Sequence, residues 1–286
     1  MTTFDIVWKN HRLNLGHRTC IMGILNVTPD SFSDGGKFFN FQHAINRAKQ
    51  MVEEGADIID IGGESSRPNA DPVSASEEIR RVVPVVEELV KHINVPISVD
   101  TVKAEVARRA LDAGAAIIND ITALTGDPGM AKVVADYDVP VVLMHMKGTP
   151  GTMQNNPSYE DPVGEISAYL TDAITRAEAA GIPRDKIIVD PGIGFGKTLG
   201  HNYTILKHLK NFESLGVPIL MGTSRKSFIR KTLEENGREV PMEEIELGTQ
   251  ATVSASILGG AHIVRVHDVK ATATTVRITD NIATAR

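Results

Sequence analysis

The sequence predicts an α/β fold: one (β/α)8 TIM barrel over residues 1–286, with a short N-terminal β-hairpin over residues 1–18. Three observations lead to this prediction. Short apolar runs alternate with amphipathic segments, a pattern typical of a parallel sheet covered by helices. Eight such runs occur in 286 residues, which favours a closed barrel over an open doubly wound sheet. Nearly every run ends in a polar or charged residue, as expected where barrel chemistry lies at the C-terminal strand ends.

The N-terminal segment, residues 3–15, predicts the hairpin. FDIVW alternates polar and apolar residues, KN is a turn signal, and HRLNL returns. We expect this hairpin to plug the bottom of the barrel.

The eight predicted strands follow in chain order. They read CIMGILNV, DIIDIGG, PISVD, AIINDI, PVVLMHM, IIVDPG, PILMGTS and HIVRVHD. Apolar residues at helical spacing predict helices between them, over residues 41–55, 74–86, 102–113, 161–181, 203–210, 243–258 and 270–285. Pro84 is expected to kink or restart the second of these helices.

Composition limits the classes of partner. The net charge of −6 and the pI near 5.9 argue against nucleic acid or an anionic membrane as the main partner. The only cysteine, Cys20, lies in an apolar run, so we expect a buried, reduced thiol and no thiolate zinc site. No run approaches the length of a membrane span, and the first residues lack the apolar core of a signal peptide. We therefore expect a cytoplasmic protein.

The stretch IIVDPGIGFGKT, residues 187–198, carries the densest signal. It resembles a phosphate-binding P-loop, but that pattern needs a glycine where Pro191 stands. It does not fit GxGxxG either, because the third glycine comes one residue early. What remains is a carboxylate, Asp190, at the end of a buried strand beside a loop that can wrap closely around a ligand.

Cations follow the last two predicted strands. The loop with Ser224, Arg225 and Lys226 follows strand seven, and Arg265 and His267 lie two residues apart near the end of strand eight. Loops in these positions often hold phosphate in barrels, so we expect an anion pocket. The alternative is a solvated basic patch, which the apolar neighbours of Arg265 argue against.

Carboxylates form a second group. Asp100 ends PISVD, Asp190 ends IIVD, and Asn119 lies on an intervening strand. A buried carboxylate is costly unless it is paired, and the edge of a flat heterocycle with adjacent N–H donors would supply two parallel bonds. The alternative is that one of these acids pairs internally with a lysine or arginine of the barrel.

Two long loops complete the candidate site. Residues 26–40 carry two acids, a glycine pair and the amide oxygen of Asn26, which could help to hold a Mg²⁺ bound mainly by substrate phosphates. We expect this loop to act as a lid rather than a surface linker. The loop after strand two adds Arg67 as a cation. His145 has no second ligand at metal-binding spacing, so we expect an orienting or packing role, and the absence of a recognisable triad disfavours covalent catalysis.

Taken together, the motifs resemble the dihydropteroate synthase family. The resemblance rests on MGILNVTPDSFSDGG, GGESSRP, SVDT, NDI, DPGIGFGKT, GTSRKS and RVHD, in the family's order and across nearly the whole chain. It implies a transferase of folate biosynthesis that condenses 6-hydroxymethyl-7,8-dihydropterin diphosphate with p-aminobenzoate. The products would be 7,8-dihydropteroate and diphosphate, formed by a dissociative displacement in which positioning matters more than a general base. It also implies Mg²⁺, sulfonamides as competing ligands, and a homodimer.

The resemblance assigns roles to individual residues. The pterin would be bound by Asp100, Asn119, Met144, Asp190 and Lys226. The p-aminobenzoate would be bound by Ser66, Arg67, Pro68, Phe195, Lys226 and Ser227. The diphosphate would be bound by Asn26, Arg67, Arg265 and His267, with Asn26 also a ligand of Mg²⁺. The catalytic residues would be Asp34, Arg67 and Lys226, with Asp34 stabilising positive charge that develops on the pterin methylene.

One departure from the family pattern concerns the second loop, SSRPNA where STRPGA is common. Ser66 lacks a methyl group and Asn69 replaces a glycine, which puts the fit of p-aminobenzoate and of sulfonamides in question. A competing function is a barrel that transfers the methyl group of methyltetrahydrofolate to a corrinoid protein. It would share the pterin carboxylates, but it has no need of the SRKS, RVHD and SSRP elements. A non-catalytic binding protein is the third possibility, and two charged lids argue against it.

Overall fold

The computed structural model describes residues 2–27, 37–65, 73–234 and 237–285. Eight parallel strands form one sheet in the order β8-β7-β6-β5-β4-β3-β10-β9. Their bounds are β3 Cys20–Asn26, β4 Ile58–Gly62, β5 Ile97–Asp100, β6 Ile117–Asp120, β7 Val141–Met144, β8 Ile187–Asp190, β9 Leu220–Met221 and β10 Ile263–Val266. A parallel bridge between Val189 and Ile219 joins β8 to the segment entering β9, so the sheet closes into a barrel. The predicted fold class is confirmed.

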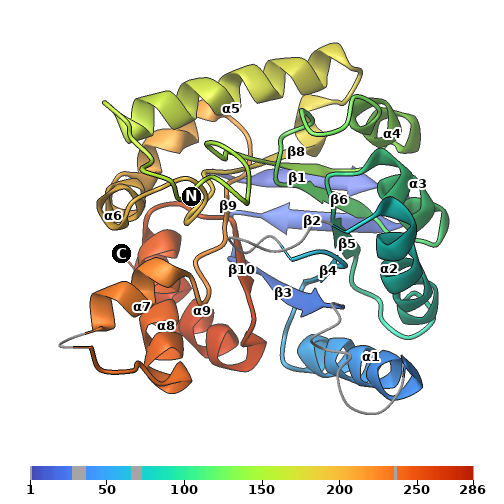
Figure 1. The fold of residues 1–286 in the computed structure, drawn as a ribbon, viewed down its shortest axis with the longest axis horizontal. Coiled ribbons are helices and arrows are strands. Elements are labelled where there is room, and N and C mark those ends of the chain that lie inside the picture. The colour runs from blue at the N-terminus through green and yellow to red at the C-terminus, as the bar shows by residue number, and fades with distance from the viewer. Residues whose placement is uncertain (1, 28–36, 66–72, 235–236, 286) are drawn as a thin grey trace.

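Helices surround the strands (Figure 1). They are α1 Lys37–Glu53, α2 Ala75–Leu89, α3 Ala104–Asp112, α4 Met130–Tyr137, α5 Pro162–Ala179, α6 Leu199–Lys207, α7 Ser227–Leu233, α8 Met242–Leu258 and α9 Val269–Thr284. Two 3-10 helices, η2 Arg184–Lys186 and η3 Leu209–Leu215, precede β8 and β9. The strands are buried on both faces, which explains why their sequences are nearly continuous apolar runs.

The N-terminal hairpin consists of β1 Phe4–Trp8 and β2 His11–Leu15. Trp8 Nε1 donates to the carbonyl oxygen of Ala116 at 2.8 Å, and Ala116 directly precedes β6. His262, which directly precedes β10, contacts the carbonyl oxygen of Thr2 through Nε2 at 3.0 Å. Both partners lie at N-terminal strand ends, so the hairpin covers the bottom of the barrel, as predicted.

The predicted strands and helices are present, but the helix predicted over 203–210 is α6 Leu199–Lys207 followed by η3. Three further details differ. Each apolar run contains a strand, although the run PILMGTS yields only the two residues of β9. Helices α4 and α7 were not predicted, because eight and seven residues are too few to display a helical period. The helix expected to kink or restart at Pro84 does not restart there: α2 runs through it, with Pro84 exposed and Val82 and Val86 on either side buried in the core.

Cys20 is buried and unpaired, and burial raises the pKa of its thiol to about 12. Among the described residues, no helix combines the length and apolar character needed to cross a membrane.

Candidate active site

Four strand residues form a hydrogen-bonded group that we call the paired cluster: Asp60 of β4, Asp100 of β5, Asn119 of β6 and Arg265 of β10. Arg265 donates from Nε to Asp60 Oδ2 at 2.6 Å and from Nη2 to Asp100 Oδ2 at 2.8 Å. Asn119 donates to the same Asp60 oxygen at 3.1 Å. The paired cluster therefore links four strands, at the middle of β4 and toward the C-terminal ends of β5, β6 and β10.

Asp60 is the member of this cluster that sequence reasoning missed. The available signal was an acid inside the buried run DIIDIGG, which is the same kind of signal that singled out Arg265. Asp60 is fully buried, and its Oδ1 has no hydrogen-bond partner among the described residues. An unsatisfied buried carboxylate oxygen is costly, so this oxygen is a ready acceptor for a ligand N–H group.

The charges of the paired cluster support one another. Burial raises the pKa of Asp100, and the charge of Arg265 opposes that shift. Burial alone would lower the pKa of Arg265, but Asp60 and Asp100 outweigh burial and the net shift is upward. The internal pairing of Asp100 with an arginine matches the alternative that the sequence left open. A guanidinium carries five N–H donors, and Nη1 has no partner among the described residues, so donors remain for an anion.

A second group, which we call the lysine cluster, consists of Asp190, Phe195, Lys197 and Lys226. Lys226 Nζ lies 3.9 Å from the centroid of the Phe195 ring, a cation–π contact. Burial lowers the pKa of Lys226 to about 8. Asp190 ends β8 and accepts a hydrogen bond from the Gly192 N–H at 2.7 Å, while burial raises its pKa. Within the described part of the chain, no member of this cluster makes an ion pair.

Lys197 was not predicted as a site residue, and it holds two loops together. Its Nζ lies 2.9 Å from His145 Nδ1 and donates to the carbonyl oxygen of Phe195 at 2.9 Å. Burial lowers the pKa of Lys197 to about 7 and that of His145 to about 3, so His145 is neutral at physiological pH and accepts from the lysine. The His145 ring also packs edge-on against Tyr169 at 4.8 Å between centroids. The expected packing role of His145 agrees with these contacts.

The glycines of residues 190–198 allow this close approach. Gly192 and Gly196 both have positive φ, at 73° and 64°. A Cβ at Gly192 would lie 1.9 Å from the carbonyl oxygen of His145, and one at Gly196 would lie 2.3 Å from that of Lys147. The stretch that resembled a phosphate loop is thus the wall that carries Phe195 and Lys197.

The two cations of the loop after β9, Arg225 and Lys226, have partners in different parts of the structure. Arg225 has a φ of 56° and its guanidinium pairs with Glu246 of α8, whereas Lys226 reaches Phe195. The expected anion pocket therefore does not include Arg225. Ser224 turns toward β10, where its Oγ lies 2.9 Å from His267 Nδ1.

Asn26 ends β3 and is exposed. A Cβ built on Gly62 would lie 3.6 Å from Asn26 Oδ1 and 3.7 Å from the Cβ of Asp100, so the absent side chain at Gly62 leaves space between them. The described residues contain no group of three histidine, cysteine or acidic side chains that could hold a metal ion. This donor set fits a Mg²⁺ that takes one amide oxygen from the protein and the rest from a ligand's phosphates and water.

Met144 and Ser227 are two further predicted site residues. Met144 ends β7 and packs in a small buried cluster with Phe195 and Met153. Ser227 begins α7 and borders a cavity of about 200 Å³. Other residues that line this cavity are Lys197, Thr198, Asn202, Phe228 and Lys231.

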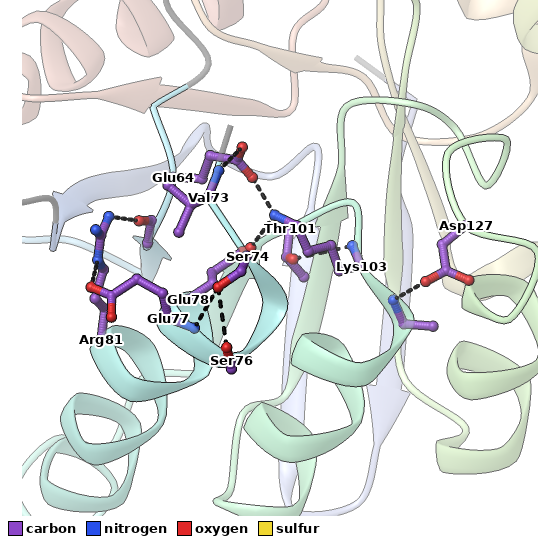
Figure 2. A network of polar contacts seen from close by, with 12 residues as sticks. Glu64, Val73, Ser74, Ser76, Glu77, Glu78, Arg81, Thr101, Lys103 and Asp127 are labelled. Carbon is purple, nitrogen blue, oxygen red and sulfur yellow. Dashed lines mark hydrogen bonds and ion pairs between the residues drawn. The ribbon is translucent and has the colours of Figure 1, made fainter. Parts of the chain in front are cut away.

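A polar network missed by sequence reasoning lies beside β4 and β5 (Figure 2). Lys103 contacts Glu64 and also donates to Glu78 of α2 at 2.5 Å. Glu64 accepts a hydrogen bond from the Val73 N–H at 3.0 Å, and Glu78 is fully buried. One lysine thus joins the segment after β4, helix α2 and the segment that leads into α3.

Four of the predicted site residues, Asp34, Ser66, Arg67 and Pro68, lie outside the described residues. Their predicted roles stay predictions.

Comparison with known proteins adds independent observations. The family described as pterin binding enzyme matches residues 22–267. A dihydropteroate synthase from Synechocystis sp. is 48% identical over 265 residues, which cover 93% of this chain and 90% of the relative.

Solved structures agree with these matches. The Yersinia pestis dihydropteroate synthase in complex with a sulfonamide drug superposes with a TM-score of 0.91 at 44% identity, covering 99% of this chain and 100% of that one. The Xanthomonas albilineans dihydropteroate synthase with 4-aminobenzoic acid gives a TM-score of 0.90 at 44% identity, with both chains fully covered. This chain therefore belongs to the pterin-binding enzyme family and, within it, to the dihydropteroate synthases.

Proposed function

We propose that this chain joins 6-hydroxymethyl-7,8-dihydropterin diphosphate to p-aminobenzoate, releasing diphosphate and 7,8-dihydropteroate. The observation that carries the proposal is the placement of the paired cluster and the lysine cluster on one barrel, at the strand ends where barrel enzymes work. The sequence identity of this chain to a dihydropteroate synthase supports the same reaction.

The pterin is assigned to the space between the two clusters. A pterin edge presents adjacent N–H donors, which suit the carboxylate of Asp190 and the unsatisfied Oδ1 of Asp60. Asn119 offers an amide beside them, and Met144 an apolar surface. Bonds from the ligand would favour the charged form of Asp190 and so reverse part of the upward pKa shift that burial causes.

The p-aminobenzoate is assigned to the surface formed by Phe195 and Ser227, with Ser66, Arg67 and Pro68 of the second loop. Phe195 offers a ring face for stacking, and Ser227 a hydroxyl at the start of α7 for the carboxylate. The Yersinia pestis relative binds a sulfonamide drug, which supports sulfonamides as competing ligands here.

The diphosphate is assigned to Asn26, Arg67, Arg265 and His267, with Mg²⁺ held by Asn26 and the phosphate oxygens. The bound ion would neutralise charge on the leaving group. The remaining donors of Arg265 would contribute positive charge while Asp60 and Asp100 hold the guanidinium in place. Preorganised donors of this kind act where charge develops.

The reaction then needs little proton chemistry from the protein. The bond between the pterin methylene and the diphosphate oxygen breaks, and its electron pair leaves with the diphosphate. The lone pair of the neutral aromatic amine forms the new C–N bond, and that nitrogen loses a proton. Asp34 and Asp190 are assigned to stabilising the cationic pterin between these two events. Orientation of the amine replaces activation by a base.

The test is a condensation assay with the purified chain, the dihydropterin diphosphate, p-aminobenzoate and Mg²⁺. We expect equal amounts of dihydropteroate and diphosphate, and none when p-aminobenzoate is omitted. Asp190→Asn should abolish turnover, whereas Asp185→Asn, on η2 at the opposite end of β8, should not. Folded wild-type protein without product would overturn the proposal.

We further propose a homodimer in the cytoplasm, built from one barrel domain per chain. Helices α8 and α9 expose five large apolar side chains, Met242, Leu247, Leu258, Ile278 and Ile282. Large apolar side chains exposed on two helices that pack together are typical of a subunit interface. Light scattering should give the mass of a dimer for the wild-type protein and a larger share of monomer for Ile282→Glu. A monomeric wild type would contradict the proposal.

A further inference from the structure

Ser224 and His267 are linked by two hydrogen bonds that involve the same hydroxyl. The His267 backbone N–H donates to Ser224 Oγ at 3.2 Å, and His267 Nδ1 lies 2.9 Å from that oxygen. On its other side, the carbonyl oxygen of His267 accepts from Arg47 Nη2 of α1 at 3.2 Å. The backbone of His267 is therefore held from both directions, and its ring is held through Nδ1.

The hydrogen-bonding capacity of the Ser224 hydroxyl determines which group donates and which accepts between Ser224 Oγ and His267 Nδ1. A hydroxyl has one O–H donor and two acceptor positions. Ser224 is 4% exposed, and the backbone N–H of His267 already uses one acceptor position. Among the described residues, Nδ1 is the only acceptor placed to receive the Ser224 O–H. If Nδ1 carried a proton instead, the serine O–H would be a buried donor without an acceptor, which is unfavourable.

We propose that Ser224 is a positioning residue that holds His267 as the neutral tautomer with its proton on Nε2. This inference rests on the proposed role of His267 toward diphosphate. An imidazole whose Nδ1 accepts a hydrogen bond must present Nε2 as a donor. A fixed N–H donor suits a diphosphate oxygen, whereas the other tautomer would direct a lone pair at the anion. In this role Ser224 acts through His267, by setting which ring nitrogen can donate to the diphosphate.

The arrangement gives Ser224, the first serine of the GTSRKS motif, a partner different from that of Lys226. Lys226 contacts Phe195 within the lysine cluster, while Ser224 contacts His267 after β10, a residue assigned to the diphosphate. One loop thus positions a group on each side of the site.

The first test measures the tautomer directly, without turnover. Nitrogen-15 NMR of the histidine rings reports which nitrogen is protonated, and His267→Gln identifies the His267 signals among the nine histidines. In wild-type protein we expect an unprotonated Nδ1 and a protonated Nε2. In Ser224→Ala we expect a mixture of both tautomers. Ser256→Ala, which removes another buried hydroxyl, from α8, should leave the His267 signals unchanged. A protonated Nδ1 in the wild type would overturn the inference.

The second test measures binding of inorganic diphosphate with Mg²⁺ by calorimetry. Losing one oriented hydrogen bond should raise the Kd of Ser224→Ala about 2- to 10-fold, with no change for Ser256→Ala. An unchanged Kd in Ser224→Ala together with a raised Kd in His267→Gln would overturn the positioning role. Wild-type affinity in His267→Gln would overturn the proposed diphosphate role of the histidine itself, while the ring spectra still test the Ser224 contact.

Discussion

The paired cluster and the lysine cluster use buried charge in different ways. In the paired cluster, Arg265 bridges Asp60 and Asp100, so each of these charges has an opposite charge within hydrogen-bonding distance. In the lysine cluster, Lys226 makes a cation–π contact with an aromatic ring. Lys197 makes hydrogen bonds with a carbonyl oxygen and an imidazole. Burial accordingly lowers the pKa of both lysines. The first arrangement pairs its charges internally, and the second leaves its charged groups without an ion-pair partner among the described residues.

The largest expected effect is on stability, when the paired cluster is broken. Arg265→Met leaves two buried carboxylates without their cation, and the free energy of unfolding should fall by about 3–5 kcal/mol. Urea unfolding measures the loss. Arg12→Met is the control, because Arg12 also pairs with a carboxylate, Asp5, but at the exposed surface, where we expect a loss below about 1 kcal/mol. Equal losses in the two variants would contradict the stabilising role of the paired cluster.

The lysine cluster should show the opposite behaviour. Lys226→Met removes a charge that burial disfavours, so the free energy of unfolding should hold or rise. Activity should fall about 100-fold or more, because a buried cation at the reacting ligand is lost. Steady-state kinetics and urea unfolding on the same samples separate the two effects. Arg225→Met is the matched control, since its guanidinium pairs with Glu246, and it should retain activity. A stable, fully active Lys226→Met would remove this lysine from the site.

Lys103 tests whether pairing or residue type explains the difference between the two clusters, because it is a lysine that is paired with two carboxylates. Lys103→Met leaves the fully buried Glu78 without its cation, and we expect a loss of about 2 kcal/mol, less than for Arg265 because Lys103 is partly exposed. Lys132→Met, from an exposed pair with Asp136 on α4, should cost about 0.5 kcal/mol. A Lys103 variant as stable as the Lys132 variant would show that Glu78 is satisfied in another way.

The pH dependence of activity tests the charge of Lys226. Burial lowers its pKa to about 8, so the charged form is lost as pH rises through that value and kcat/KM should decline above it. Lys226→Arg keeps its charge and should lack this decline. A decline near pH 7 that persists in the arginine variant would instead be assigned to Lys197, whose pKa is about 7.

The same shift predicts a stability change of defined sign. The unfolded lysine holds its proton up to its ordinary pKa of 10.5, whereas the folded one releases it near 8. Between these values the unfolded state binds more protons, so the folded wild type gains stability as pH rises. Unfolding experiments at several pH values should show wild type gaining on Lys226→Met across this window, and a loss would contradict the lowered pKa.

The smallest expected effect lies outside both clusters. Ser66→Thr restores the methyl group that the family pattern carries, and it should change the affinities for p-aminobenzoate and a sulfonamide by about 0.5 kcal/mol. Titration calorimetry with each ligand measures both values. Identical affinities would show that the methyl group is irrelevant in this chain.

Much of the fold was predictable because barrel strands and helices leave local patterns. Each apolar run of the sequence contains a strand, and Asp161 followed by Pro162 correctly marked the start of α5. Helix α7 was missed because seven residues show no period. The helix around Pro84 was predicted, but not that it runs on without a restart, because packing on either side outweighs one lost hydrogen bond.

The candidate site was less predictable, since its contacts join distant residues. Arg265 meets Asp60 205 positions away, and nothing local to either residue encodes that pair. Arg225 and Lys226 are adjacent and equally charged, yet a left-handed backbone at Arg225 turns them apart. Strand-end position identifies which residues face the site, but their pairing requires the closed barrel.

Gly192 and Gly196, in the loop that carries Phe195 and Lys197, limit how the sequence of this enzyme can change. At Gly192 and Gly196 any side chain would meet the backbone of the neighbouring loop, and both positions have positive φ. Side chains at Gly192 and Gly196 are therefore disfavoured both by contact with backbone and by the local backbone conformation. Sequence change that reshapes this part of the site must come from positions whose side chains already project.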